Sequence, residues 1–345
     1  MSAAVDLGPA LAASERFGWE VVDLVVLTDG HINDSYLVRT DDDGYVLQRI
    51  NLAVFPHPDA ISSNIQAVHR HLGGELVPDP VPAADGGWLH RDRDEVWRAL
   101  RRVPAAGPCA ELTPKFAWQA GSLLGRFHAS LSDFDPTQLA VTLPHFHDLR
   151  SRLDELGSVV EADPCGRVEG ARHQIDQALD GSELADLADD LASKVPRRVA
   201  HYDAKLDNFL FRAGEAVCLV DLDTLMPGQW LFDVGDLLRT ASSTAPEDCR
   251  DAEAVSVDPE LYDAVIHGYF ESMPEGLLTC DERVALEVAG ALVTWEQALR
   301  FLTDWLAGDR YYRTTRPEQN LDRARAQLHL LSSMPGPAAI GMPPS

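Results

Sequence analysis

The sequence of 345 residues lacks the features that mark several classes of protein. No apolar run approaches the length of a membrane span, and the N-terminus has neither the basic start nor the hydrophobic segment of a secretory signal. The five cysteines are scattered, odd in number and without a C-x-x-C pair, which argues against a disulfide framework or a zinc site. These absences favour a soluble protein of the reducing cytoplasm.

Lysine is scarce as well. Only Lys115, Lys194 and Lys205 occur, and arginine supplies nearly all of the positive charge. The formal net charge of −26 argues against nucleic acid or an anionic membrane as a partner. The length allows a sizeable core and suggests two lobes. We expect a monomer or a weak homo-oligomer that handles small molecules.

One stretch, residues 199–239, holds the polar residues around which the rest of the chain is organised. Short apolar strands are expected at 208–211 and 216–220. The polar residues beside them are His201, Asp203, Lys205, Asn208 and Asp221. An unpaired carboxylate at the end of a buried strand costs free energy, so residues of this kind rarely serve packing alone.

The order of these residues is what phosphoryl transfer from ATP requires. His-x-Asp, four residues and Asn, followed by an apolar strand that ends in Asp, has the spacing of kinase sites. Asp203 would accept the proton of the acceptor hydroxyl, and Lys205 would reach the transferring phosphate. Asn208 and Asp221 would hold Mg²⁺. The alternatives are an ordinary Asx-capped turn and, for Lys205, a solvated loop lysine.

The N-terminal part predicts a small antiparallel sheet with strands at 19–27, 36–39 and 44–50. A polar turn at 29–35 lies where nucleotide kinases cover the phosphates with backbone N–H groups, although an ordinary hairpin would have the same composition. Its candidate nucleotide contacts are Gly30, Asn33 and Ser35.

The third strand is where a kinase carries its phosphate-pairing lysine, but no lysine precedes Lys115. If Gln48 lies in that position, it is expected to face the nucleotide and Arg49 to point away, whereas a shift of one residue would reverse the two. Asn64, on a helix predicted at 58–72, could pair with Gln48 in place of a Lys–Glu ion pair, or it could be a solvated helix asparagine. Further short strands are expected at 77–81, 87–89 and 96–103.

The remainder is mostly helical. Helices are predicted at 114–131, 146–160, 170–191, 231–241, 259–272, 281–306 and 317–331. In the first of them, Gly121 and Gly125 would allow close packing, and we interpret His128 as a buried, hydrogen-bonded histidine rather than a ligand.

The expected fold class is therefore α+β, with a small N-terminal lobe built on an antiparallel sheet and a larger, mainly helical C-terminal lobe. The prolines at 104–108 predict a hinge between the lobes. We expect a nucleotide-binding lobe at 1–104, a catalytic and substrate lobe at 105–333, and a disordered tail at 334–345.

Taken over most of its length, the chain resembles the aminoglycoside phosphotransferase/choline kinase superfamily, whose fold is similar to that of eukaryotic protein kinases. HYDAKLDN (201–208) resembles its catalytic loop, and LVDLDT (219–224) its metal-binding strand end. Within the superfamily the chain looks most like the N-acetylhexosamine 1-kinases, which also lack the N-lobe lysine. The segments that carry this resemblance are GHINDSYLV, YVLQRIN, VDLDTLMPG, FDVGDLLRT and RFLTDWLAGDRYYR.

The resemblance implies a bilobal protein-kinase-like fold and a sugar kinase with ATP and Mg²⁺ as cofactors. Asp203 would be the base, Lys205 would neutralise the transferring phosphoryl group, and Asn208 and Asp221 would hold the metal. Asp223 would either join the metal site or bond the catalytic loop. The anomeric hydroxyl of GlcNAc or GalNAc would attack the γ-phosphate and give the sugar 1-phosphate and ADP.

Sugars are bound by planar polar groups and aromatic faces, so Arg300, Asp304 and Tyr312 are the candidate substrate contacts. Trp295 and Phe301 are assigned to packing. Two other functions remain open. The first is a kinase of the same fold that acts on an amino alcohol, an aminoglycoside or a hydroxylysine-like substrate. The second is a pseudokinase without turnover, against which the intact catalytic motif weighs.

Overall fold

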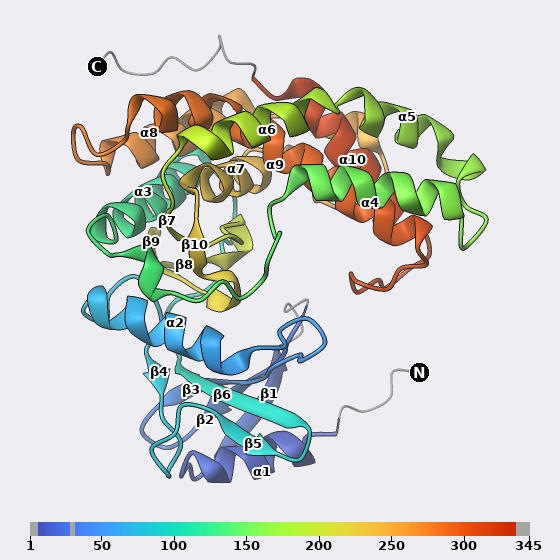
Figure 1. Cartoon of the computed structure of the whole chain (residues 1–345). Coiled ribbons are helices and arrows are strands. Elements are labelled where there is room, and N and C mark those ends of the chain that lie inside the picture. Colours follow the sequence, from blue (N-terminus) through green and yellow to red (C-terminus); the bar gives the residue numbers. More distant parts are fainter. Residues whose placement is uncertain (1–5, 28–31, 336–345) are drawn as a thin grey trace.

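The computed structural model describes residues 6–27 and 32–335 and consists of an N-terminal antiparallel sheet and a larger, mainly helical C-terminal part (Figure 1). This arrangement confirms the predicted α+β fold class. None of the helices in the described residues is long and apolar enough to cross a bilayer.

The N-terminal sheet has the strand order β1-β2-β3-β6-β4, with β5 also paired to β6, and every pairing is antiparallel. Its strands are β1 (Asp23–Leu27), β2 (Asp34–Arg39), β3 (Gly44–Arg49), β4 (Pro80–Val81), β5 (His90–Asp92) and β6 (Glu95–Arg101). The strand predicted from residue 19 begins four residues later. Its start, Trp19, instead stacks on Tyr45 with ring centroids 4.1 Å apart.

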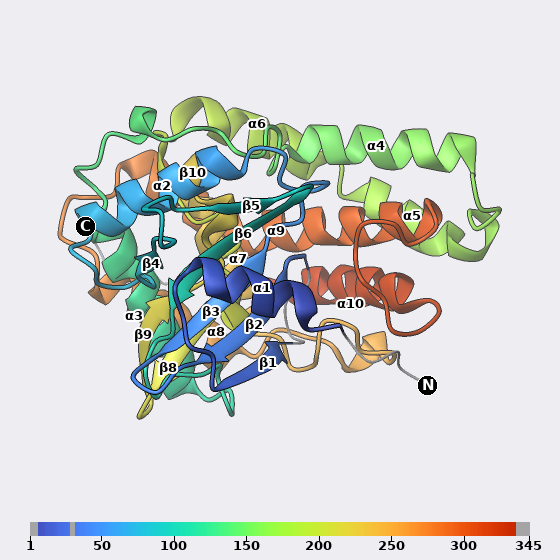
Figure 2. The same cartoon turned by 90° about the horizontal axis from the view of Figure 1, so that it is seen from below.

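The two faces of this sheet carry different side chains, because successive residues of a strand point to opposite faces. One face is apolar and includes Trp97, and it packs against α1 (Gly8–Arg16), which lies in front of the sheet in Figure 2. The opposite face carries Ser35, Gln48 and Arg98, which are direct neighbours in the strand register. This polar row faces the C-terminal part, since Arg98 forms an ion pair with Asp223.

Helix α2 (Pro58–His71) lies between the sheet and the C-terminal part (Figure 1). Asn64 on this helix is only 2% exposed. Its amide donates to the carbonyls of Ala140 and Leu225, at 2.8 and 2.9 Å, and accepts from Ala140 N. Both interpretations of Asn64 were therefore wrong: it is neither a partner of Gln48 nor solvated, because its amide satisfies backbone groups of the C-terminal part.

The C-terminal part is built around α9, against which α4, α5, α6, α7 and α10 all pack. Its helices are α3 (Pro114–Ser130), α4 (Leu149–Ala162), α5 (Arg172–Asp180), α6 (Glu183–Lys194), α7 (Trp230–Ala241), α8 (Pro259–Glu271), α9 (Cys280–Leu306) and α10 (Gln319–Ser333). Its short strands are β7 (Arg198–Ala200), β8 (Phe209–Arg212), β9 (Glu215–Leu219) and β10 (Met226–Gly228). Its 3₁₀ turns are η1 (Pro136–Gln138), η2 (Glu169–Ala171), η3 (Leu206–Asn208), η4 (Leu222–Thr224) and η5 (Ala252–Ala254).

Glycines set two features of this packing. At Gly121 on α3, a Cβ atom would lie 2.1 Å from the Val265 carbonyl of α8, which confirms the predicted close approach. The helix predicted at 170–191 is divided into α5 and α6 at Gly181. A Cβ atom there would meet the indole of Trp295 at 2.5 Å. This indole is buried and donates to the Ala178 carbonyl at 2.9 Å, so Trp295 serves packing as expected.

The segment that links the sheet to the helical part is anchored to the C-terminal part. Gly107 and Phe211 exchange two backbone hydrogen bonds, at 3.0 and 2.7 Å. Because Phe211 belongs to β8, the link runs directly to the strand that follows residues 201–208. The predicted lobe boundary at 104/105 stays a prediction.

Candidate active site

The loop between β7 and β8 brings together Asp203, Lys205 and Asn208. Lys205 Nζ donates to both carboxylate oxygens of Asp203, at 3.1 and 2.8 Å. Asn208 Nδ2 donates to Asp203 Oδ2 at 2.9 Å and to the Asp203 carbonyl at 2.7 Å. Burial alone would raise the pKa of Asp203, but Lys205, His201 and Asn208 outweigh it and lower the pKa. The side chain is still 27% exposed, so an ionised carboxylate faces the solvent.

Asp233 on α7 holds this loop in place. Its carboxylate accepts the backbone N–H groups of His201 and Tyr202, at 2.8 and 2.6 Å, and pairs with His128 Nε2 at 2.9 Å. Both Asp233 and His128 are fully buried, and burial, which outweighs the attraction of Asp233, lowers the pKa of His128. The prediction of a buried, hydrogen-bonded His128 is confirmed. No role for Asp233 was inferred from the sequence, although an aspartate in the first turn of an apolar helix is a usable signal.

The backbone of Tyr202 is strained, with φ at +65°, a conformation that bulky residues rarely adopt. Several contacts fix it. His147 Nε2 lies 3.1 Å from the Tyr202 carbonyl, and His147 Nδ1 lies 2.6 Å from the buried Glu296. Gln229 N donates to the Tyr202 hydroxyl at 3.2 Å. Strain of this kind persists where the surroundings over-determine it, often at functional sites. Sequence reasoning missed His147 and Glu296.

Asp221 follows β9 and has a left-handed backbone, with φ 62° and ψ 58°. Val220, the residue before Asp221, donates its backbone N–H to the backbone carbonyl of Asn208 at 2.9 Å. Burial, and then the neighbouring Asp223 and Asp203, raise the pKa of Asp221 to about 6. The positive charges of Lys205 and Arg98 oppose this rise in the pKa but do not cancel it.

These features fit a divalent cation that arrives with the nucleotide. Asn208 uses only its Nδ2 atom in the contacts with Asp203, which leaves its side-chain oxygen Oδ1 as a candidate metal ligand, together with the Asp221 carboxylate. Across the part of the chain that the structure describes, no three His, Cys, Asp or Glu side chains form a metal-binding group of their own. Mg²⁺ is commonly bound by one or two carboxylates together with substrate phosphates.

The sheet face that is directed toward this loop carries a chain of hydrogen bonds. Gln48 Nε2 donates to Ser35 Oγ at 3.0 Å, and Arg98 Nε donates to Gln48 Oε1 at 2.9 Å. Arg98 Nη1 forms a buried ion pair with Asp223 Oδ1, and Asn33 Nδ2 donates to Asp223 Oδ2 at 2.5 Å. The structure therefore joins Ser35 and Gln48 to Asp223 through Arg98, and Asn33 to Asp223 directly.

Gly30, the remaining candidate of this group, lies outside the described residues. Arg98 was not singled out from the sequence, because its partners lie 50 and 125 residues away along the chain. The prediction that Asp223 is a metal ligand stays a prediction. In the structure, both of its carboxylate oxygens accept hydrogen bonds from side chains of the N-terminal part.

Arg300 on α9 lies among three aromatic rings. Its Cζ atom is 5.2 Å from the centroid of Phe146, 5.7 Å from that of Tyr311 and 5.6 Å from that of Tyr312. Burial would lower the pKa of Arg300, but the two tyrosines and the Asp203 carboxylate are among the groups that raise it. Arg300 therefore lies within electrostatic reach of Asp203, with flat apolar surfaces around its guanidinium.

Asp304, one turn further along α9, is fully engaged by the chain that follows the helix. Its carboxylate accepts the backbone N–H groups of Arg310 and Tyr311, both at 2.8 Å, and of Tyr312 at 3.0 Å. Asn320 Nδ2 donates to it at 2.9 Å. The structure thus brings Arg300 and Tyr312 together and uses Asp304 to hold the turn that carries the tyrosine.

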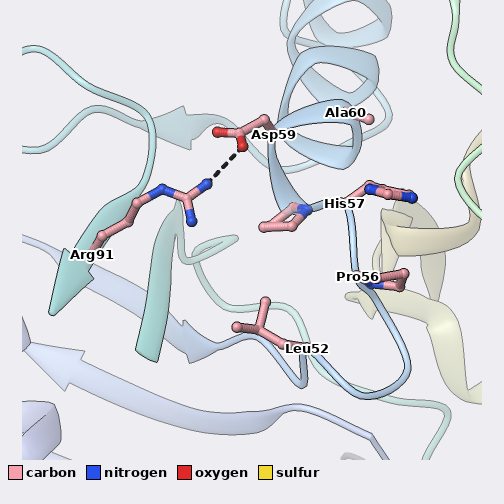
Figure 3. Close-up of a pocket in the computed structure, with 7 residues that line it drawn as sticks. Leu52, Pro56, His57, Asp59, Ala60 and Arg91 are labelled. Carbon is pink, nitrogen blue, oxygen red and sulfur yellow. Dashed lines mark hydrogen bonds and ion pairs between the residues drawn. The ribbon is translucent and has the colours of Figure 1, made fainter. Parts of the chain in front are cut away.

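A separate hollow of about 470 Å³ opens where α2 begins. Figure 3 shows Arg91 and Asp59 joined across it by an ion pair of 2.7 Å. Both side chains are largely exposed, at 49% and 81%, and such surface pairs contribute little free energy. None of the candidate residues lines this hollow, so it is distinct from the site described above.

Comparisons with known proteins agree with this geometry. Residues 23–278 match the family described as "Phosphotransferase enzyme family". The chain is similar to the homoserine kinase of Polaromonas naphthalenivorans, with 25% identity over 76% of this chain and 77% of the relative. It is also similar to that of Zymomonas mobilis, with 28% identity over 81% and 80%.

Solved structures show the same fold at low sequence identity. An amicoumacin kinase in complex with AMP-PNP and Ca²⁺ superposes with a TM-score of 0.63 at 16% identity, covering 96% of this chain and 95% of that one. The choline kinase LicA of Streptococcus pneumoniae gives 0.60 at 13% identity, covering 95% and 99%. With the match over residues 23–278, these findings establish that the chain belongs to the phosphotransferase enzyme family, as an ATP-dependent small-molecule kinase with a protein-kinase-like fold.

Proposed function

We propose that this protein transfers the γ-phosphoryl group of ATP to the anomeric hydroxyl of an N-acetylhexosamine, GlcNAc or GalNAc, in a Mg²⁺-dependent reaction. The products are the sugar 1-phosphate and ADP. The observation that carries the proposal is the ionised, partly exposed Asp203 carboxylate with Lys205 and Asn208 bonded to it. We place the enzyme in the cytoplasm, as a monomer or weak homo-oligomer.

Asp203 is the catalytic base in this proposal. Its lowered pKa keeps it ionised at neutral pH, so it orients the acceptor hydroxyl and takes its proton late, as suits a loose phosphoryl-transfer transition state. The sugar oxygen forms a bond to the γ-phosphorus. The bond from phosphorus to the bridging oxygen breaks, and its electron pair leaves with ADP. Lys205, within 3.1 Å of the Asp203 carboxylate, adds positive charge beside the phosphoryl oxygens.

Asn208 and Asp221 are the proposed metal ligands. Bound Mg²⁺ supplies charge neutralisation for the triphosphate and the leaving ADP. Asp223 is the third candidate metal ligand. Its two carboxylate oxygens accept hydrogen bonds from Arg98 and Asn33, and each oxygen has a second lone pair with which it could bind the metal.

Nucleotide binding is assigned to the N-terminal part, residues 1–104, and acceptor binding to residues 105–333. The turn that contains Gly30 would cover the phosphates, with Asn33, Ser35 and Gln48 on the sheet face beneath them. Support for this assignment comes from the hydrogen bonds that link these three side chains to Arg98 and Asp223.

The acceptor site is assigned to Arg300 and Tyr312. The guanidinium among three rings offers hydrogen-bond donors and flat apolar surfaces, which suit a sugar ring with an acetamido group. The positive charge of Arg300 near Asp203 disfavours acceptors whose only charged group is a cation, such as choline. We assign Asp304 to positioning Tyr311 and Tyr312 rather than to the sugar, since its carboxylate already binds that turn.

A second candidate acceptor is an amino alcohol that bears a carboxylate. Two relatives at 25% and 28% identity are homoserine kinases, and an arginine beside the base could pair with an amino-acid carboxylate. The same Asp203 and metal ligands would serve this reaction, because only the acceptor pocket differs.

The deciding experiment incubates the protein with Mg-ATP and a matched panel of GlcNAc, GalNAc, homoserine and choline. ADP release identifies the acceptor, and phosphorus NMR locates the new phosphate. The proposal expects an anomeric phosphate on an N-acetylhexosamine. O-phosphohomoserine would establish the second candidate instead. If ADP release with every acceptor is no faster in wild type than in Asp203→Ala, the result would support a pseudokinase.

A further inference from the structure

The N-terminal sheet has no lysine with which to bind the nucleotide phosphates. In kinases that cation sits on the third strand and pairs with the α- and β-phosphates. Here the third strand carries Gln48, a neutral amide, and the lysine nearest to it in sequence is Lys115 on α3. Lys205 is already engaged by both oxygens of Asp203. Another cation is needed on the nucleotide side of the site.

Arg98 occupies the matching place on the neighbouring strand. It is the register partner of Gln48 and lies on the same sheet face, directed toward the catalytic loop. It is only 4% exposed. Gln48 and Asp223 hold its Nε and Nη1 atoms by hydrogen bonds. These bonds fix the orientation of the guanidinium group.

The third guanidinium nitrogen is unused. Arg98 Nη2 is buried and has no hydrogen-bond partner among the described residues. Buried arginine donors are normally satisfied, because an unpaired donor loses its hydration without compensation. Asp221 lies two residues from Asp223, the partner of Arg98, so the free nitrogen is close to the place where a metal-bound triphosphate would lie.

We propose that Arg98 binds the α- and β-phosphates of the nucleotide through Nη2, in place of a lysine on β3, and that Asp223 positions it for this contact. The inference rests on the proposed use of ATP. A guanidinium suits the task because its planar donors match phosphate oxygens and it is always charged. The Arg98–Asp223 pair would then take the part that a Lys–Glu ion pair plays in protein kinases, with its carboxylate supplied by the C-terminal part.

The test compares ligands with and without phosphates. Isothermal titration measures the affinity of MgADP and of adenosine for wild type, Arg98→Met and Arg98→Lys, with Arg101→Met as control. Arg101 lies on the same strand, but its side chain is 45% exposed and pairs with Asp43 at the surface. We expect Arg98→Met to weaken MgADP at least about tenfold, as for a lost charged hydrogen bond, and to leave adenosine unchanged. Arg98→Lys should restore part of the affinity, and Arg101→Met should bind both ligands like wild type.

Equal losses for MgADP and adenosine would show that Arg98 only supports the fold, and unchanged MgADP affinity would overturn the inference outright. If Arg98→Met does not fold, the same comparison is made with Arg98→Lys, where a selective loss for MgADP is again expected. Failure of the proposed use of ATP looks different, because wild type itself would then bind MgADP no better than adenosine. Asp223→Asn should raise the KM for ATP while the Mg²⁺ concentration for half-maximal rate stays the same. A large rise in that Mg²⁺ concentration would make Asp223 a metal ligand instead.

Discussion

The catalytic loop and the sheet face opposite it carry opposite kinds of chemistry. The loop side is acidic, with Asp203 and Asp221 in one short segment and Asn208 between them. The sheet side is neutral or positive, with Gln48 and Arg98 on separate strands. A metal-bound triphosphate needs both, since oxygen ligands hold the cation while donors hold the phosphates.

The two sides also differ in how far apart their residues lie along the chain. On the loop side, His201 to Asp221 form one continuous stretch, so spacing alone predicted which side chains meet. On the sheet side, Arg98 meets Gln48 and Asp223 only because strand register and the packing of the two parts bring them together. No local pattern encodes such contacts, which is why the sequence showed that a lysine is missing but did not show what replaces it.

The same contrast between local and distant contacts applies to the prediction of the fold. Periodicity located the long helices to within a few residues, because burial of one helix face is a local pattern. It joined α5 to α6 across Gly181, where the indole of the distant Trp295 leaves no room for a side chain. It also misread Asn64, whose backbone partners at Ala140 and Leu225 lie far along the chain.

The contrast between the acidic loop and the sheet face can first be tested on the loop, at Asp221. Asp221→Ala removes the carboxylate whose pKa is raised to about 6 by burial and by the neighbouring acids. We expect kcat to fall by about 10³-fold, the scale of losing one electrostatic stabiliser, and more Mg²⁺ to be needed for half-maximal rate. Rates measured across a MgCl₂ series give both quantities. An unchanged Mg²⁺ requirement would remove Asp221 from the metal site.

The hydrogen bonds by which Asp233 holds the catalytic loop can be removed separately. Asp233→Asn places an amide where two backbone N–H groups and His128 meet a buried carboxylate. We expect a loss of about 3 kcal/mol in the free energy of unfolding, as for lost charged hydrogen bonds in a core. Urea unfolding followed by circular dichroism measures it, with the exposed Asp263→Asn as matched control. Equal midpoints for both variants would contradict this supporting role.

The acceptor side should respond in KM rather than in nucleotide binding. Arg300→Met keeps a long apolar side chain among the three rings but removes the charged donors. The KM of the acceptor should rise about tenfold or more, with the KM for ATP unchanged, in steady-state assays. The exposed Arg310→Met serves as the control. A rise confined to ATP would move Arg300 out of the acceptor site.

The smallest effect is expected at Gln48. Gln48→Ala removes a neutral link between Ser35 and Arg98, while the charge on Arg98 stays. We expect the KM for ATP to rise about fivefold or less, with kcat nearly unchanged, because Gln48 carries no charge and Arg98 keeps its ion pair with Asp223. A loss as large as that of Arg98→Met would mean that Gln48, not Arg98, is the main phosphate contact.

The most direct test of phosphoryl transfer at Asp203 is a single-turnover measurement with Mg-ATP and the identified acceptor. Asp203→Asn is compared with Asp207→Asn, an exposed aspartate in the same loop. If Asp203 is the base, Asp203→Asn lowers the rate of the chemical step by about 10²- to 10⁴-fold with MgADP affinity retained, and Asp207→Asn reacts like wild type. A rate near that of wild type in Asp203→Asn would contradict the central role given to this carboxylate.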